Sequence, residues 1–322
     1  MSIAIWPSVS PDELRRKASE TQEFSMLIRL DKARELEWIV DETLQVCRDL
    51  KHGLEDCYAL LAPIDPGSTL LISTPRNEKV KGTLTRVGTR IVKGLRTIPA
   101  QTLSLAPPNV IHIQGLDALH GHLNQSIDLL SIVFSKPQDA RSLASTLSIL
   151  ADSLTDSLAL LKGPPLTDSD PAWQMSSCPP SQFVPSIGPN LSFYLGLQES
   201  CIILWLRALE PVHAHVHFGT KLGLAIGTVR RLEHDEMDTI FRYNTQGSDI
   251  GGSRRGSARH TPEPRSTADV NSNDIQEVYV REKVRVESAD PSLISIQSKL
   301  SYLSRMLGQA RRNIAEVLSV DS

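Results

Sequence analysis

The feature that most constrains this fold is a set of leucine-rich stripes with helical spacing. In four segments, 31–61, 116–133, 140–161 and 293–317, apolar side chains recur every three or four residues with polar ones between them. This spacing predicts amphipathic helices. A fifth segment, 190–209, is apolar on most sides, which predicts a helix in a central position. Because single amphipathic helices are marginal in water, we expect the N-terminal, middle and C-terminal helices to form one antiparallel bundle.

Between the stripes the apolar period falls from about 3.6 to 2, which predicts strands. β-branched residues and turn residues such as Pro75 and Gly88 support this reading. The expected strands are 68–74, 79–86, 89–97, 109–114, 213–218, 221–229 and 278–286. Since the strands are segregated from the helices, the sequence predicts an α+β fold.

These elements imply two discontinuous domains. The helical domain comprises 1–62, 117–210 and 289–322, and the inserted β-domain comprises 63–116 and 211–288. Segment 163–189 is rich in Pro, Ser and Asp, which predicts an irregular connection. Segment 247–273 has almost no apolar residue, which predicts a disordered insertion.

Composition narrows the class of protein. With 40% hydrophobic residues the chain can bury a large core, and a net charge of -3 does not favour binding to nucleic acid. No apolar run approaches the ~20 residues of a membrane-spanning helix, and the first residues lack a secretory signal pattern. The scattered Cys47, Cys57, Cys178 and Cys201 read as reduced core residues. We therefore expect a cytoplasmic protein that reaches membranes only through partners.

Motifs for chemistry are few. The sequence lacks the phosphate-binding, dinucleotide, nucleophile-elbow and HExxH patterns, so we expect no catalytic residue and no cofactor. His213, His215 and His217 alternate and would share one face of a strand, a spacing compatible with three imidazole ligands for zinc. The alternative is a solvated strand face, which the lack of a neighbouring carboxylate or cysteine favours, so no metal site is predicted.

Other polar motifs have ordinary explanations. His120 and His122 flank Gly121 near an expected helix start, where capping or solvent exposure explains them. Ser257 follows an Arg-Arg-Gly sequence and Thr261 precedes a proline, so both match short kinase motifs in the predicted disordered insertion. Phosphorylation there is a hypothesis of regulation.

Three stretches, taken in order, carry a family resemblance. They are the helix Leu36-Glu37-Trp38-Ile39-Val40-Asp41-Glu42, the strand pair Asn77-Glu78-Lys79-Val80-Lys81-Gly82-Thr83-Leu84, and the strand and helix from Glu277 to Val317. Together they resemble the Rogdi family, which includes the second subunit of the fungal RAVE complex. The leucine-zipper label of that family fits poorly, since Pro63, Pro137 and Pro211 interrupt the stripes.

The resemblance implies a helical bundle that contains both termini, with an inserted β-domain. It also implies a non-catalytic adaptor that sits beside a large propeller-containing RAVE subunit. RAVE-like complexes promote assembly of the vacuolar proton pump, the V-ATPase, by rejoining its peripheral sector to its membrane sector. The implied partners are that large subunit and, directly or indirectly, the peripheral subunits of the pump.

The sequence therefore leaves three classes of function open, of which the third is the weakest. The first is this adaptor, for which we expect a partner-binding patch on the terminal helix around Leu300, Leu303 and Leu307. The second is a cytosolic enzyme or small-ligand binder with a site where the sheet meets the bundle. The third is a free-standing scaffold whose disordered arm binds regulators.

Overall fold

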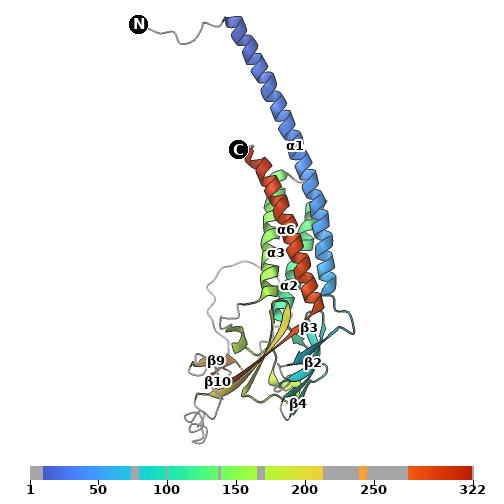
Figure 1. Ribbon diagram of the computed structural model, residues 1–322, viewed down its shortest axis with the longest axis vertical. Coiled ribbons are helices and arrows are strands. Elements are labelled where there is room, and N and C mark those ends of the chain that lie inside the picture. Colours follow the sequence, from blue (N-terminus) through green and yellow to red (C-terminus); the bar gives the residue numbers. More distant parts are fainter. Residues whose placement is uncertain are drawn as a thin grey trace, which may run out of the picture. The chain divides into compact units, whose positions relative to one another are not determined.

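The computed structural model describes residues 10–73, 80–98, 101–136, 139–164, 171–212, 239–244 and 275–320. Within these ranges lie the long helices α1 (Pro11–Leu60), α2 (Gln114–Ser135), α3 (Ala140–Lys162) and α6 (Pro291–Val320), together with two antiparallel sheets (Figure 1). The predicted α+β class is confirmed. The chain divides into two compact units, each described separately below.

The first unit contains the described residues of Met1–Glu55, Gln125–Thr155 and Ser301–Ser322, all of them helical apart from short connections. Each of its four helical segments contacts two others. Helix α1 meets α2 where the Arg48 guanidinium lies 5.9 Å from the Phe134 ring, and α2 meets α3 where Ser126 Oγ lies 2.9 Å from Ser153 Oγ. Helix α6 meets α3 where Arg311 donates a hydrogen bond to Ser148 over 3.1 Å, and it meets α1 where Leu303 lies against Gly53. The apolar stripes, which include Cys47, Leu50, Leu147 and Leu307, are buried between the segments.

The second unit, Asp56–Asn124 with Asp156–Leu300, contains both sheets. The first sheet has the order β1 (Ser68–Ser73), β2 (Lys81–Val87), β3 (Arg90–Ile98), β4 (Gln101–Leu105) and β6 (Phe183–Val184), and β5 (Ile111–His112) pairs with β3. The second has the order β7 (Leu191–Gln198), β8 (Cys201–Pro211), β10 (Ile275–Ala289) and β9 (Phe241–Asn244). The predicted strands 68–74, 79–86, 89–97 and 278–286 are thus confirmed, whereas 213–218, 221–229 and the insertion 247–273 lie outside the described residues.

The predicted helix 190–209 is wrong, because the structure forms the β7–β8 hairpin there. The hairpin pairs Leu191 with Ala208 and Gln198 with Cys201. Its residues are largely buried along both strands, so the sequence reads as a continuous apolar run instead of an alternation. Such a run does not distinguish a buried strand from a buried helix by period alone.

The turn of this hairpin closes the C-terminus of α3. Glu199 and Ser200 have φ values of 49° and 60°, as a two-residue hairpin turn of the primed type requires. Their backbone N–H groups donate to Lys162 O over 2.9 Å and to Leu161 O over 2.8 Å. These bonds satisfy carbonyls that have no partner within α3. Ser200 Oγ also donates to Gln297 Oε1 of α6 over 2.7 Å, so one turn positions two helices.

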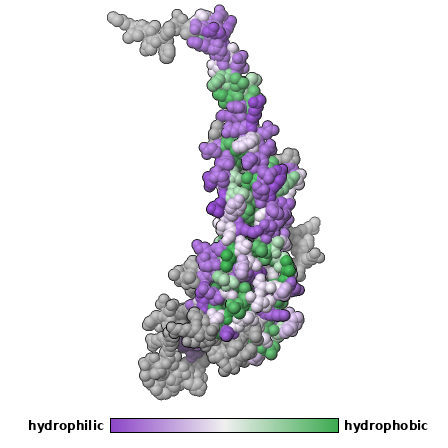
Figure 2. Space-filling view, turned by 45° about the vertical axis from the view of Figure 1, so that its right-hand side comes forward, coloured by the Kyte–Doolittle hydropathy of each residue, from purple (hydrophilic) through white to green (hydrophobic). Residues whose placement is uncertain are grey.

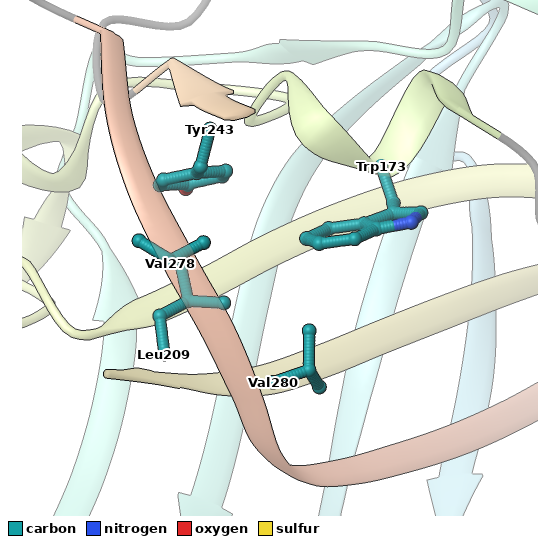
Figure 3. Packing of buried hydrophobic residues seen from close by; sticks show 5 residues of the cluster. All are labelled: Trp173, Leu209, Tyr243, Val278 and Val280. Atoms are coloured by element: carbon teal, nitrogen blue, oxygen red, sulfur yellow. The ribbon is translucent and has the colours of Figure 1, made fainter. Parts of the chain in front are cut away.

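A small hydrophobic cluster stabilises the far strands of the second sheet. Trp173 packs beside Leu209 of β8, Tyr243 of β9, and Val278 and Val280 of β10, and all five side chains are buried (Figure 3). Trp173 belongs to a 3₁₀ turn that precedes the sheet in the sequence. The cluster therefore holds the short β9 strand to β10 by side-chain packing as well as by pairing.

Two of the four cysteines are expected to resist thiol reagents in the folded protein. Burial raises the pKa of the Cys47 thiol and of the Cys57 thiol to about 11. Because the thiolate is the reactive form, its fraction at pH 8 falls by about 100-fold relative to an ordinary thiol. We expect dithionitrobenzoate at pH 8 to modify both residues only after unfolding in urea. Rapid modification of Cys57 in the native protein would show that this part of the core is open.

Candidate functional site

A cavity of about 550 Å³ lies within the second unit. Its walls are the first turns of α2, the last turns of α3, the segment Met175–Ser177 and strand β7. Apolar groups dominate the lining, and the polar side chains that reach it include His122, Asp156 and Tyr194. An apolar cavity with a few convergent polar groups is the usual form of a small-molecule site.

Two glycines bring the helix ends close to β7 along this wall. Gly163 follows the last residue of α3 with φ +70°, and a Cβ there would lie 2.3 Å from Leu197 O. A Cβ on Gly115, in the first turn of α2, would lie 3.0 Å from Leu197 Cδ1. Gly163 therefore requires glycine, whereas a side chain at Gly115 would require Leu197 Cδ1 to move by a few tenths of an ångström.

Replacement of Gly163 by alanine is expected to lower the free energy of unfolding by about 2–3 kcal/mol. The change combines an unfavourable positive φ with a direct clash at the Leu197 carbonyl. Equilibrium urea denaturation measures the effect. Gly121→Ala is the matched control because a Cβ there meets nothing within 4 Å, and alanine favours a helix. Equal stability of the two variants would contradict the close approach of α3 to β7.

His122, which lines the cavity, has one ring nitrogen without a hydrogen-bond partner among the described residues. Its Nδ1 atom is buried and unbonded among the described residues. Burial of an unbonded imidazole nitrogen is unfavourable, so a bound molecule with a donor or acceptor would stabilise it. Neither His120 nor His122 caps α2, so the expected capping role is wrong, and both side chains are partly buried. Both lie inside α2, where His120 packs against the Tyr58 ring at 4.6 Å between centroids.

The cavity does not assemble an evident nucleophile and base among the described residues. Ser176 Oγ donates to Cys178 O over 2.7 Å, and Ser177 Oγ accepts from Leu195 N over 2.7 Å, so both hydroxyls are bonded to backbone. Within the described part of the chain, no group of three or more His, Cys, Asp or Glu side chains is placed to hold a metal ion.

The other predicted site residues have different outcomes. His213, His215 and His217, and the phosphorylation candidates Ser257 and Thr261, lie outside the described residues. Leu300, Leu303 and Leu307, predicted as an exposed docking patch, are 0%, 3% and 0% exposed. Their placement on the surface is wrong, because the apolar stripe of α6 points into the protein core.

The exposed apolar surface lies instead on the N-terminal part of α1. Between residues 24 and 30 five large apolar side chains are from 42% to 66% exposed, namely Phe24, Met26, Leu27, Ile28 and Leu30. In Figure 2 this stretch is a green band on the visible face of the helix. In Figure 1 the same part of α1 continues past the other helical segments of its unit. The leucine stripe does not predict this surface, because the expected helix begins only at residue 31.

The fold and this surface together define an α+β protein with a four-segment helical unit, two antiparallel sheets and an apolar helix segment in solvent. The chain belongs to the Rogdi family: a family model described as "Rogdi leucine zipper containing protein" matches residues 35–315. No curated protein matches the chain.

The leucine stripes of the matched region form part of the chain's own core. The stripe leucines inside it, such as Leu147 and Leu307, are buried within the chain's own core. The exposed segment 24–30 lies before residue 35 and so falls outside the match. Among the described residues, no helix is long and apolar enough to span a bilayer.

Proposed function

We propose that this chain is a non-catalytic adaptor subunit of a RAVE-like complex, which regulates assembly of the vacuolar proton pump by protein–protein interaction. Membership of the Rogdi family over residues 35–315 is the observation that carries the proposal. Exposed apolar side chains on α1 support an interaction role, since contiguous apolar surface on a soluble domain usually marks a binding site. In this proposal the chain is not an enzyme.

The proposed partners are a large propeller-containing subunit and, directly or through it, the peripheral subunits of the V-ATPase. The protein would act in the cytoplasm and reach vacuolar or endosomal membranes through these partners.

Vacuolar pH in a deletion strain tests the proposal. Cells that lack the chain should acidify their vacuoles poorly after glucose is removed and restored, because that treatment demands reassembly of the pump. Expression of the intact chain should restore acidification. Normal acidification kinetics in the deletion strain would refute the proposed function.

A second candidate function is binding of a small molecule in the cavity of the second unit. The observation that favours it is the buried Nδ1 of His122, which has no hydrogen-bond partner among the described residues. Native mass spectrometry of the purified full chain would detect a bound metabolite as added mass. The variant His122→Phe should lose that mass, and a wild-type chain without added mass, even after incubation with a cell extract, would remove this candidate.

A further inference from the structure

We propose that the exposed part of α1 pairs with the same segment of a second copy of this chain, in antiparallel orientation. The inference goes beyond the proposed function and does not depend on it. It rests on the spacing, exposure and charge of one face of α1 between residues 14 and 38.

This face has the repeat of a two-stranded coiled coil. Its positions alternate in steps of three and four residues, as the core positions of a heptad do. They are Leu14, Lys17, Thr21, Phe24, Ile28, Asp31, Glu35 and Trp38, and all eight are exposed. The Trp38 side chain is 61% exposed, although α1 already packs against its unit nearby through Val40 and Thr43. All residues of α1 from Pro11 to Asp31 are exposed, and this face stays exposed at Glu35 and Trp38, where α1 begins to pack.

Antiparallel pairing makes every position of this face complementary. When Phe24 lies opposite Ile28 of the second copy, Leu14 lies opposite Trp38. The same register places Lys17 opposite Glu35 and Thr21 opposite Asp31. Because the two copies are related by a two-fold axis, each of these pairs occurs twice. The interface then has apolar contacts at its centre and both ends, separated by pairs of opposite charge or hydrogen-bonding groups.

Parallel pairing in register would be unfavourable on the same face. It would place Lys17 against Lys17, Asp31 against Asp31 and Glu35 against Glu35. Like charges at adjoining positions weaken such pairing. Next to the paired face, Glu20 of one antiparallel copy approaches Arg34 of the other. Parallel copies lack this pair of opposite charges. The charge pattern thus selects the antiparallel arrangement.

A lipid surface fits this segment less well. Helices that lie on anionic membranes carry an excess of Lys and Arg on their polar face. Residues 11–42 contain nine acidic and six basic side chains, a net negative charge. The apolar side chains are also interrupted on the proposed face by Lys17, Asp31 and Glu35. These ions would lose hydration in a membrane but find partners in a second copy.

Sedimentation velocity of the purified full chain at micromolar concentration tests the pairing. We expect a concentration-dependent dimer. The variants Lys17→Glu and Glu35→Lys should each raise the dimer Kd by about 10-fold or more, since each replaces two attractions with two repulsions. The double variant should restore the Kd to near the original value, because the charges face each other again with reversed sign.

The control variant is Arg15→Glu, which makes the same change of net charge as Lys17→Glu but on the outward side of the helix. It should leave the Kd within about twofold of the original, and circular dichroism should show unchanged helix in all variants. A chain that is monomeric at every concentration would overturn the proposal. A dimer that both single variants leave intact, or that the double variant fails to restore, would overturn the antiparallel register.

Discussion

Replacement of Asp290 by alanine is expected to lower the free energy of unfolding by about 3–5 kcal/mol. Asp290 is fully buried, and its Oδ2 accepts a hydrogen bond from Arg86 Nε over 2.6 Å. Arg86 is itself only 3% exposed. Removal of the carboxylate would leave a buried guanidinium without its counter-charge, which is among the largest penalties that a single substitution causes.

The same carboxylate begins α6. Its Oδ1 accepts from Ser292 N over 2.9 Å, and Pro291 occupies the first helical position. Asp290→Asn keeps the cap but loses the charge, so this variant separates the two roles. We expect it to retain most of the destabilisation, since loss of the cap alone costs about 1 kcal/mol.

Urea denaturation followed by circular dichroism measures both variants. Glu287→Gln is the control, because the Glu287 side chain is 59% exposed, and it should change stability by less than about 1 kcal/mol. A loss below that value for Asp290→Ala would contradict the burial of the Arg86–Asp290 pair.

Replacement of Leu303 by alanine is expected to lower the free energy of unfolding by about 2–5 kcal/mol. Leu303 packs directly against Gly53 of α1, where an added Cβ would lie 2.6 Å from Leu303 Cδ2. Its side chain is 3% exposed, so truncation would create a cavity between α1 and α6. Differential scanning calorimetry would record the loss as a lower melting temperature.

Tyr302→Ala is the matched control on the same helix. Tyr302 is 57% exposed, and its truncation should change stability by no more than about 0.5 kcal/mol. If Leu303→Ala proved as stable as Tyr302→Ala, the terminal helix would be less well packed than the structure indicates. The exposure of Leu300, Leu303 and Leu307 that the sequence predicts would then have to be measured again.

The helices of the first unit could be predicted because a leucine stripe depends on local spacing alone. The stripe of α3 from Leu143 to Leu161 lies on one face of a single helix and is buried there. The length of α1 was underestimated for the same reason. Before residue 31 the apolar side chains lie on several sides of the helix and polar residues interrupt the heptad positions, so no continuous leucine stripe marks the helix there.

The β7–β8 hairpin lacks the alternation typical of a strand because both of its faces are buried. The polar residues Gln198, Glu199 and Ser200 interrupt the apolar run at the turn. The two consecutive β-branched residues Ile202 and Ile203 favour a strand. These signals were present in the sequence but were weaker than the apolar run around them. A break of two or three polar residues inside such a run is better read as a turn than as one exposed side of a helix.

The cavity could not be predicted from local sequence. Its lining combines residues near 112–122, 156–164, 175–177 and 194–197, which approach one another only in the folded unit. The burial of the His122 Nδ1 atom depends on these distant segments, so the residues next to His122 in the sequence do not predict it. The burial of Leu300, Leu303 and Leu307 likewise depends on segments far away in the chain.

Affinity purification of the tagged full chain from its own cells, followed by mass spectrometry, tests the central claim most directly. The account predicts recovery of a large propeller-containing protein together with peripheral V-ATPase subunits, at amounts well above those in an untagged control. Recovery of the chain with neither of them, under conditions that preserve known V-ATPase assemblies, would contradict the adaptor function.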